Sequence, residues 1–272
     1  MLKDLFTPCL ILDRGKLDNN IRKIKSIVSK RKIDFRPHLK TAKCLEITKI
    51  LVKEFGSRAM VSTIEELERL KSSGINDFLY SVAIVPNKLD RIAKNLTSNC
   101  KITVSVDNIS TAQELVNFYK NTGNKITAVI ELDLDGHRSG VRPYANDQLI
   151  KIGKCLDEFD LFRGVMSHAG ESYGLSNEED IKICARNEAD QTLMAAETIQ
   201  KAGINCELVT IGSTPTALSG CKNAGITELR AGVFLFFDLV QSGVGVCEVE
   251  EIALSVLTSV TVSYTHLTLP TN

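Results

Sequence analysis

The sequence carries no excess of charge, because 33 lysine and arginine residues balance 33 aspartate and glutamate residues. Such a chain generates no net field that would hold nucleic acid or an anionic membrane surface. Four histidines do not change this balance. We therefore expect a small molecule as the partner, and neither nucleic acid nor a membrane.

Long hydrophobic runs are missing as well. The longest, residues 231–240, is about half of the ~20 residues that cross a bilayer, and it contains Asp238. Near the first residue, Lys3, Asp4 and Pro8 stand where a signal peptide would have its apolar segment. The eight cysteines are spread singly, without a C-x-x-C motif, which is typical of a reducing compartment. These absences predict a cytoplasmic protein.

A regular alternation of strands and helices is what the sequence does contain. Eight short apolar and β-branched runs are each expected to form a strand: Ile33–Pro37, Ala59–Thr63, Asp77–Ser81, Lys101–Val106, Ile126–Asp133, Leu161–Ser167, Glu207–Ile211 and Thr227–Arg230. Amphipathic stretches follow all but the last, and another precedes the first. This α/β pattern predicts a (β/α)8 TIM barrel, with a doubly wound open sheet as the main alternative.

The two ends of the sequence do not follow this alternation of strands and helices. We expect the barrel to occupy residues 13–243, and residues 1–12 and 244–263 to form strands of an incomplete C-terminal β domain. Residues 264–272 offer no apolar pattern that would pair with a sheet. We interpret them as a non-native or disordered tail and expect the natural chain to continue past about Ser263; a genuine short tail is the alternative.

Lys40 follows the first predicted barrel strand and precedes a helix. In a parallel barrel the carboxyl ends of the strands form the catalytic face. A lysine held there among apolar neighbours would have a lowered pKa, and its free amine could condense with a carbonyl compound. The alternative is a solvated charge at the beginning of a helix.

The segment Gly212-Ser213-Thr214-Pro215-Thr216 follows the seventh strand and predicts an anion site. Glycine allows the backbone to approach a ligand, two hydroxyls follow, and proline suits the first turn of a helix. In barrels the loops after strands seven and eight commonly bind phosphate, and Gly232-Val233 lies in the second of these loops. An ordinary capped helix is the alternative.

Three more side chains at strand exits could contact a ligand. Arg138 could hold a carboxylate or phenolate, or form an ion pair with Asp135 or Glu131. His168 and Tyr173 could face a ring or be structural. Thr63 and Asp107 also end strands and are expected at the same mouth. We do not expect a metal at Asp133, Asp135 and His137, which share one extended loop.

With these residues in place, the chain resembles the pyridoxal-phosphate enzymes with an alanine-racemase-like N-terminal barrel (fold type III), specifically the D-threonine aldolase and D-serine dehydratase branch. The matching segments run in family order: Thr7-Pro8, Arg36-Pro37-His38-Leu39-Lys40-Thr41, Gly136-His137-Arg138-Ser139-Gly140, His168-Ala169-Gly170, Gly212-Ser213-Thr214-Pro215-Thr216 and Glu228-Leu229-Arg230-Ala231-Gly232.

The resemblance implies that Lys40 carries pyridoxal 5'-phosphate as a Schiff base. It implies a cofactor site whose other members are His38, Arg138, His168, Tyr173, Gly212, Ser213, Thr214, Thr216, Gly232 and Val233. It also implies a divalent metal, zinc or manganese, with ligands in a missing C-terminal region, so none is expected here. Glu171, Met166 and Phe237 depart from residues that are frequent in the family, which puts some substrate and cofactor contacts in doubt.

The implied activity is that of a lyase on D-β-hydroxy amino acids, either an aldolase that cleaves Cα–Cβ or a dehydratase that removes the hydroxyl. Without the metal region the chain is expected to bind cofactor and turn over poorly. Alternatives are a non-catalytic carrier of pyridoxal phosphate, whose chain would end cleanly after the barrel, and a racemase, which needs a second base. A homodimer is a further expectation.

Overall fold

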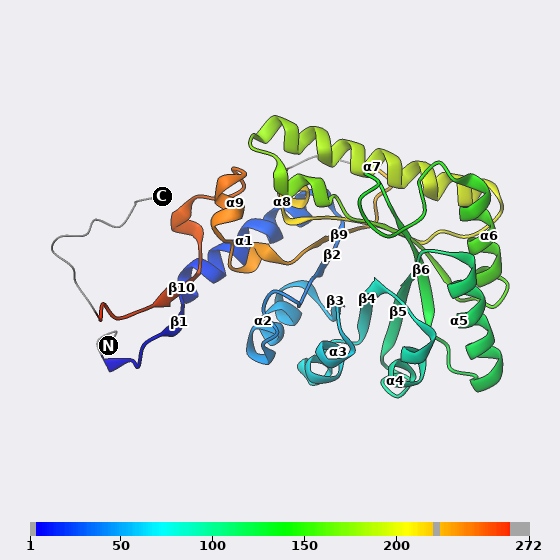
Figure 1. The fold of residues 1–272 in the computed structure, drawn as a ribbon, viewed down its shortest axis with the longest axis horizontal. Helices are drawn as coiled ribbons and strands as arrows, with labels where there is room; N and C mark the ends of the chain where they lie inside the picture. Colours follow the sequence, from blue (N-terminus) through cyan, green and yellow to red (C-terminus); the bar gives the residue numbers. More distant parts are fainter. Residues whose placement is uncertain (1–3, 220–223, 262–272) are drawn as a thin grey trace.

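The computed structural model describes residues 4–219 and 224–261, and in them eight parallel strands form one sheet. Its strand order is β2-β9-β8-β7-β6-β5-β4-β3 (Figure 1). Between β2 and β3 the ladder is reduced to one parallel bridge, from His38 to Met60, beside a 2.9 Å hydrogen bond from the Leu39 N–H to the Met60 carbonyl. The sheet is therefore a nearly closed barrel, as predicted. The strands are β2 (Asp34–Pro37), β3 (Arg58–Val61), β4 (Asp77–Ala83), β5 (Lys101–Val106), β6 (Thr127–Leu132), β7 (Phe162–Ser167), β8 (Leu208–Ile211) and β9 (Glu228–Ala231).

Helices cover the outside of the barrel (Figure 1). They are α1 (Arg14–Arg31), α2 (Leu45–Phe55), α3 (Ile64–Leu70), α4 (Leu89–Ala93), α5 (Ile109–Thr122), α6 (Asn146–Asp157), α7 (Glu178–Lys201), α8 (Thr214–Leu218) and α9 (Leu239–Gly243). Six begin at a side chain that accepts an N–H of the first turn, namely Asp13, Thr63, Asn108, Asn177, Ser213 and Asp238. None of the helices in the described ranges is both long and apolar enough to cross a bilayer.

The main core lies between the strands and the helices, because alternate strand residues point outward. Phe35 of β2 contacts the rings of Phe55 and Phe234 at centroid distances of 4.7 and 5.4 Å. Its neighbour Arg36 points inward and is 1% exposed. The two faces of one strand therefore have opposite chemistry, as the period of two requires.

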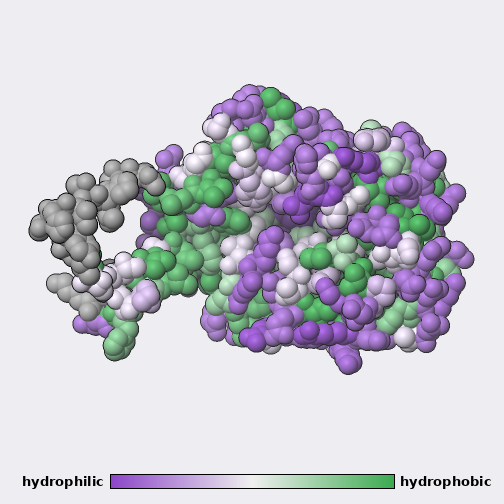
Figure 2. Space-filling view, viewed as in Figure 1, coloured by the Kyte–Doolittle hydropathy of each residue, from purple (hydrophilic) through white to green (hydrophobic). Residues whose placement is uncertain are grey.

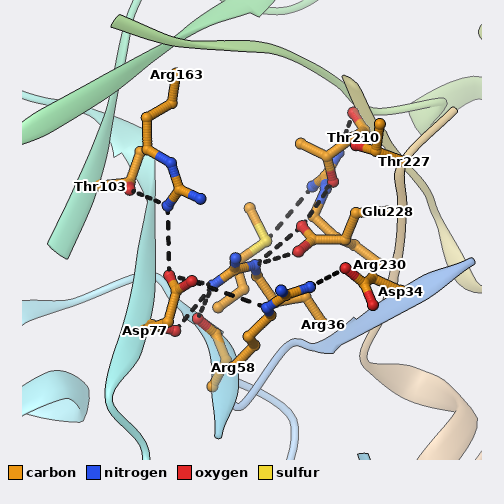
Figure 3. A network of polar contacts seen from close by, with 12 residues as sticks. Asp34, Arg36, Arg58, Asp77, Thr103, Arg163, Thr210, Thr227, Glu228 and Arg230 are labelled. Atoms are coloured by element: carbon orange, nitrogen blue, oxygen red, sulfur yellow. Dashed lines mark hydrogen bonds and ion pairs between the residues drawn. The ribbon is translucent and has the colours of Figure 1, made fainter. Parts of the chain in front are cut away.

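A network of charged and polar side chains fills part of the barrel interior (Figure 3). The Arg36 guanidinium lies between the carboxylates of Glu228 and Asp77, at 2.9 and 3.0 Å. The Thr210 hydroxyl donates to Glu228 and accepts from Nε of Arg230, both at 2.9 Å. Because burying a charge is costly unless it is paired, these contacts fix β2, β4, β8 and β9 relative to one another.

A short antiparallel ribbon of β1 (Cys9–Leu12) and β10 (Leu254–Leu257) extends away from the barrel (Figure 1). Of the strands expected over residues 244–263, the described residues contain only β10, and residues 249–251 form a 3₁₀ turn instead. Leu10 and Val256 of the ribbon are 67% and 61% exposed. Hydrophobic residues also gather where the barrel faces the ribbon (Figure 2). That the ribbon begins a second domain stays a prediction, and the expected tail at 264–272 lies outside the described residues.

The interior network generates a test of stability. Replacing Glu228 by alanine leaves Arg36 buried beside Asp77 alone, so we expect the free energy of unfolding to fall by about 3 kcal/mol or more. Denaturant unfolding of the variant checks this. Arg14→Ala, which removes the exposed pair with Asp18, is the control and should cost less than about 1 kcal/mol. Equal effects of the two substitutions would show that the interior pair has no special role.

Candidate functional site

One cavity at the carboxyl ends of the barrel strands collects most of the predicted site residues. Its volume is about 560 Å³, including open solvent at its mouth. The predicted residues that line it are His38, Lys40, Arg138, His168, Tyr173, Gly212, Ser213, Thr214, Gly232 and Val233. Thr216, Thr63 and Asp107 are not among the lining residues. Lys40 and the predicted anion loop thus open into the same space.

Lys40 lies three residues past the end of β2, at the rim of the cavity. Its pKa is lowered, first by partial burial of the ammonium and then by the positive charges of Arg138 and Arg230. Glu66 opposes the shift. A larger fraction of the amine is therefore neutral than in free lysine, as a nucleophile or base requires.

His38 lies directly under Lys40 and is 8% exposed. Its Nδ1 is 3.4 Å from the backbone nitrogen of Lys40, and its Nε2 is 3.3 Å from the Ser62 hydroxyl. Burial, followed by the charge of Lys40, holds its pKa well below the usual range. His38 is therefore neutral and supports the turn that presents Lys40.

His168 follows β7 and joins two of the loops that form the cavity. Its Nδ1 is 2.7 Å from the Gly212 carbonyl oxygen. Burial is the largest influence on its ring and lowers its pKa to about 4. A neutral ring beside a carbonyl must carry its proton on Nδ1, so Nε2 keeps a lone pair.

Tyr173 packs near the His168 ring, with 6.2 Å between the ring centroids. Its hydroxyl oxygen is 3.3 Å from the backbone nitrogen of Thr214 and accepts that N–H. Burial raises the pKa of Tyr173, whereas the N–H of Thr214 acts in the opposite direction. The phenol is therefore protonated at neutral pH, and its own proton remains available for another acceptor.

The loop from Gly212 to Thr216 opens the short helix α8, with Ser213 as N-cap and proline in the first turn. Ser213 and Thr216 form a reciprocal capping box. The Thr216 hydroxyl points away from the cavity and donates to the buried carboxylate of Glu188 at 2.8 Å. Thr216 does not line the cavity and its hydroxyl is engaged in capping, so its cofactor contact stays a prediction.

Two glycines are required where the chain passes close to itself. A Cβ on Gly212, whose φ is +144°, would lie 2.0 Å from the Arg230 carbonyl oxygen. A Cβ on Gly232 would lie 2.8 Å from Oγ1 of Thr41. The glycines at the anion loop therefore serve the close packing of strand exits as well as access for a ligand.

Arg138 reaches the cavity from the loop after β6. It forms no ion pair within 4 Å in residues 4–219 and 224–261, but its charge opposes the rise that burial causes in the pKa of Glu131, so an electrostatic interaction with that carboxylate is present at longer range. A Cβ on Gly170 would meet Cδ of Arg138 at 3.3 Å. The guanidinium is therefore held beside the cavity by packing, and its charge is available to an anionic group.

Arg230 and Glu131 also line the cavity, although neither was predicted as a ligand-binding residue: Arg230 stood in a family-matching segment and Glu131 was the alternative partner of Arg138. Arg230 is 4% exposed and donates to the Ser167 carbonyl, and burial lowers its pKa. Burial also raises the pKa of Glu131. Both lie within strands and point inward, and their signal was the charge at an inward position of an otherwise apolar strand.

The residues that depart from the family pattern lie in different settings. Met166 lines the cavity and packs with Met60 and three other apolar residues inside the barrel. Phe237 is buried, and the Lys23 ammonium lies 5.4 Å from its ring centroid. Glu171 is exposed and accepts a hydrogen bond from the Cys184 thiol.

No group of three potential metal ligands occurs in the described part of the chain. In the loop after β6, the Asp133 carboxylate accepts the Gly136 N–H at 2.8 Å. Asp135 similarly accepts the His137 N–H at 2.9 Å. Both carboxylates are therefore engaged in turns of their own loop.

The lining of the cavity fits pyridoxal phosphate. Thr214 lines it, and its buried Oγ1 makes no hydrogen bond of acceptable geometry in the described residues, so a polar partner is missing there. Arg138 and Arg230 supply positive charge, Lys40 supplies an amine, and Met60 and Met166 supply apolar contact. This is the donor set that a phosphorylated aromatic aldehyde needs.

The His168 pKa generates a test. As the pH falls, His168 takes up a proton near pH 6.5 in the unfolded chain but only near pH 4 in the folded chain. The free energy of unfolding that is present above pH 6.5 therefore decreases progressively towards pH 4. We expect His168→Asn to reduce this acid loss by roughly 2–3 kcal/mol. Denaturant unfolding from pH 7 to 4 measures it. Identical slopes for both proteins, or a protonated His168 ring in NMR spectra at pH 5.5, would contradict the burial argument.

Comparison with known proteins places these observations in a family. The profile described as alanine racemase, N-terminal domain, matches residues 12–240. D-threo-3-hydroxyaspartate dehydratase of Delftia sp. (strain HT23) is 36% identical over 95% of this chain and 68% of its own. Its crystal structure superimposes with a TM-score of 0.91 over 94% of this chain and 68% of that one.

Two further relatives agree with this match. D-serine dehydratase of Dictyostelium discoideum is 30% identical over 97% of this chain and 71% of its own. D-threonine aldolase of an Arthrobacter species is 28% identical over 85% of this chain and 61% of its own. The chain thus spans about two thirds of the length of these relatives. Together with the barrel, the lysine and the anion loop, these matches show that the chain belongs to the family of the alanine racemase N-terminal domain, whose members depend on pyridoxal phosphate.

Proposed function

We propose that this chain is the barrel of a pyridoxal-phosphate-dependent lyase acting on D-β-hydroxy amino acids. The observation that carries the proposal is that Lys40 and the Gly212–Thr214 loop line one cavity in a chain 36% identical to a D-hydroxyaspartate dehydratase. Membership of the family supports pyridoxal phosphate as the cofactor, and the relatives support D-β-hydroxy amino acids as the substrate class. The cavity supplies groups suited to both.

The residues of the cavity divide into three roles. Lys40 would hold the aldehyde carbon of the cofactor covalently through Nζ. Thr214, Tyr173 and the backbone of Gly232 and Val233 would surround the phosphate. Arg138 and His168 would flank the ring, Arg138 through its unpaired charge. When bound, pyridoxal phosphate supplies an electron sink for negative charge that develops at Cα of an amino acid.

The chain itself must move a proton at Cα. Once its amine is released, Lys40 is the cavity group with the chemistry of a base, because partial burial and two nearby arginines lower its pKa. His168 is neutral and has no proton to give from Nε2. Arg138 can orient a carboxylate of the substrate or a phenolate on the ring by charge-assisted hydrogen bonds.

Of the two lyase reactions, we propose dehydration. The two relatives described above at 36% and 30% identity are dehydratases, whereas the aldolase described above is 28% identical. A dehydratase removes the β-hydroxyl and yields ammonia and a 2-oxo acid. An aldolase cleaves Cα–Cβ and yields glycine and an aldehyde, so the products separate the two reactions.

A divalent metal, zinc or manganese, is part of the proposal only for a longer chain. A relative's structure is described as a metal-free form, which supports a metal in that protein. The described residues here include no fitting set of ligands, so no step is assigned to a metal. A homodimer likewise stays a proposal. Neither a racemase nor a non-catalytic carrier has a specific observation in its favour.

The attachment of the cofactor to Lys40 is directly testable. After incubation with pyridoxal phosphate and reduction by borohydride, we expect peptide mass spectrometry to find the label on Lys40 and Lys40→Ala to remain unlabelled. Lys43→Ala is the matched control, since Lys43 is exposed and its amine is 3.7 Å from Glu66. A label retained in Lys40→Ala would refute the assignment.

The type of reaction requires a second experiment. With D-threo-3-hydroxyaspartate, pyridoxal phosphate and added zinc or manganese, we expect slow release of ammonia and oxaloacetate that disappears in Lys40→Ala. Coupled assays for oxaloacetate and for glyoxylate measure both branches. Glyoxylate and glycine as the main products would replace the dehydratase by an aldolase.

A further inference from the structure

Glu188 of α7 is a buried carboxylate that none of the roles above uses. It is 2% exposed. Its Oε1 accepts the N–H groups of Ala169, at 3.1 Å, and Gly212, at 2.9 Å. Its Oε2 accepts the Thr216 hydroxyl at 2.8 Å. One carboxylate on the outer layer thus joins the exit loops of β7 and β8, the two loops that present His168 and the anion segment.

The carboxylate also determines which groups donate and which accept in a series of hydrogen-bonded hydroxyls. Because Glu188 can only accept, Thr216 must give its proton to it, and Thr216 Oγ1 then accepts the Ser213 N–H at 3.1 Å. On the other side, Ser172 donates to the Ala169 carbonyl at 2.7 Å. With the Ser172 and Thr216 protons placed in this way, the Ser213 hydroxyl donates to Ser172 Oγ, 2.7 Å away, or to Thr216 Oγ1, 3.1 Å away.

The hydroxyls of the anion loop therefore differ in whether their protons are already engaged in hydrogen bonds within the protein. The protons of Ser213, Ser172 and Thr216 are all engaged inside the protein. Thr214 keeps a buried hydroxyl with no partner of acceptable geometry in the described residues. Tyr173 accepts the Thr214 N–H and keeps its proton. The loop therefore offers Thr214 and Tyr173, and not Ser213, as hydroxyl donors to an anion.

We propose that Glu188 is a positioning residue that holds the two exit loops together and leaves Thr214 and Tyr173 as the hydroxyl donors to the phosphate of the ligand. This inference rests on the proposed function for the identity of the ligand. It adds a residue that lies behind the cavity and acts through the backbone of Ala169 and Gly212. Burial raises the pKa of Glu188, while its three donors and Arg230 oppose this rise.

Two substitutions at Glu188 distinguish a role through its hydrogen bonds to the loops from a role through side-chain volume alone. Glu188→Met keeps a similar length and volume but leaves the N–H groups of Ala169 and Gly212 without an acceptor. Glu188→Gln keeps one oxygen for these two N–H groups and can turn its amide NH₂ towards Thr216 Oγ1. The methionine variant should therefore lose the loop geometry, and the glutamine variant should retain most of it.

The readout is the affinity for pyridoxal phosphate relative to pyridoxal, which differ only in the phosphate. We expect Glu188→Met to weaken pyridoxal phosphate binding at least about tenfold and pyridoxal binding by less than about threefold. Glu188→Gln should stay within about threefold for both ligands. Amide exchange at Gly212 and Ala169, measured without ligand, should accelerate in Glu188→Met and stay slow in Glu188→Gln.

Asn20→Leu is the control for lost stability. Asn20 is 1% exposed and donates to the carbonyls of Leu235 and Glu251, and no hydrogen bond joins it to the exit loops of β7 and β8 in the described residues. It should lower the melting temperature without changing the preference for pyridoxal phosphate. A Glu188→Met chain that keeps the wild-type preference, or loses both ligands equally, would overturn the positioning role. A wild-type chain with no preference for pyridoxal phosphate would overturn the proposed function together with this inference.

Discussion

The site depends on the pairing of the first and last barrel strands, β2 and β9. Their parallel register places Pro37 opposite Ala231, and the His38 N–H donates to the Ala231 carbonyl at 2.8 Å. The chain that leaves β2 towards Lys40 therefore passes directly over Gly232, where a side chain would collide with Thr41. An amine from one end of the sequence meets a backbone turn from the other end because these two strands close the sheet.

The same two strands carry the charges that hold the interior together. Arg36 from β2 and Glu228 from β9 are both 1% exposed and form a buried pair. The network continues through Thr210 to Arg230, which lines the cavity (Figure 3). The support of the barrel and the electrostatics of the site are therefore one system. The positive charges of Arg138 and Arg230 lower the pKa of Lys40 and so favour its neutral amine.

Much of the fold followed from the sequence because parallel strands covered on both faces are apolar runs at regular spacing. All eight barrel strands were predicted in this way. The convergence of Lys40, Arg138, His168 and Gly212 in one cavity followed from their shared place after strands. Thr216 differed, because a sequence does not reveal that its hydroxyl caps a helix and donates to Glu188. Glu188 was not predicted, because a charge on the buried side of a helix has the same sequence pattern as a solvated one.

A crystal structure of this chain with pyridoxal phosphate is the measurement that tests the central claim most directly. The account predicts electron density continuous with Nζ of Lys40 at one end of the cofactor. At the other end, the phosphate should lie against Thr214, Tyr173 and the Gly232–Val233 backbone. Density for the cofactor outside this cavity, or a phosphate bound away from these residues with Lys40 unmodified, would contradict the account.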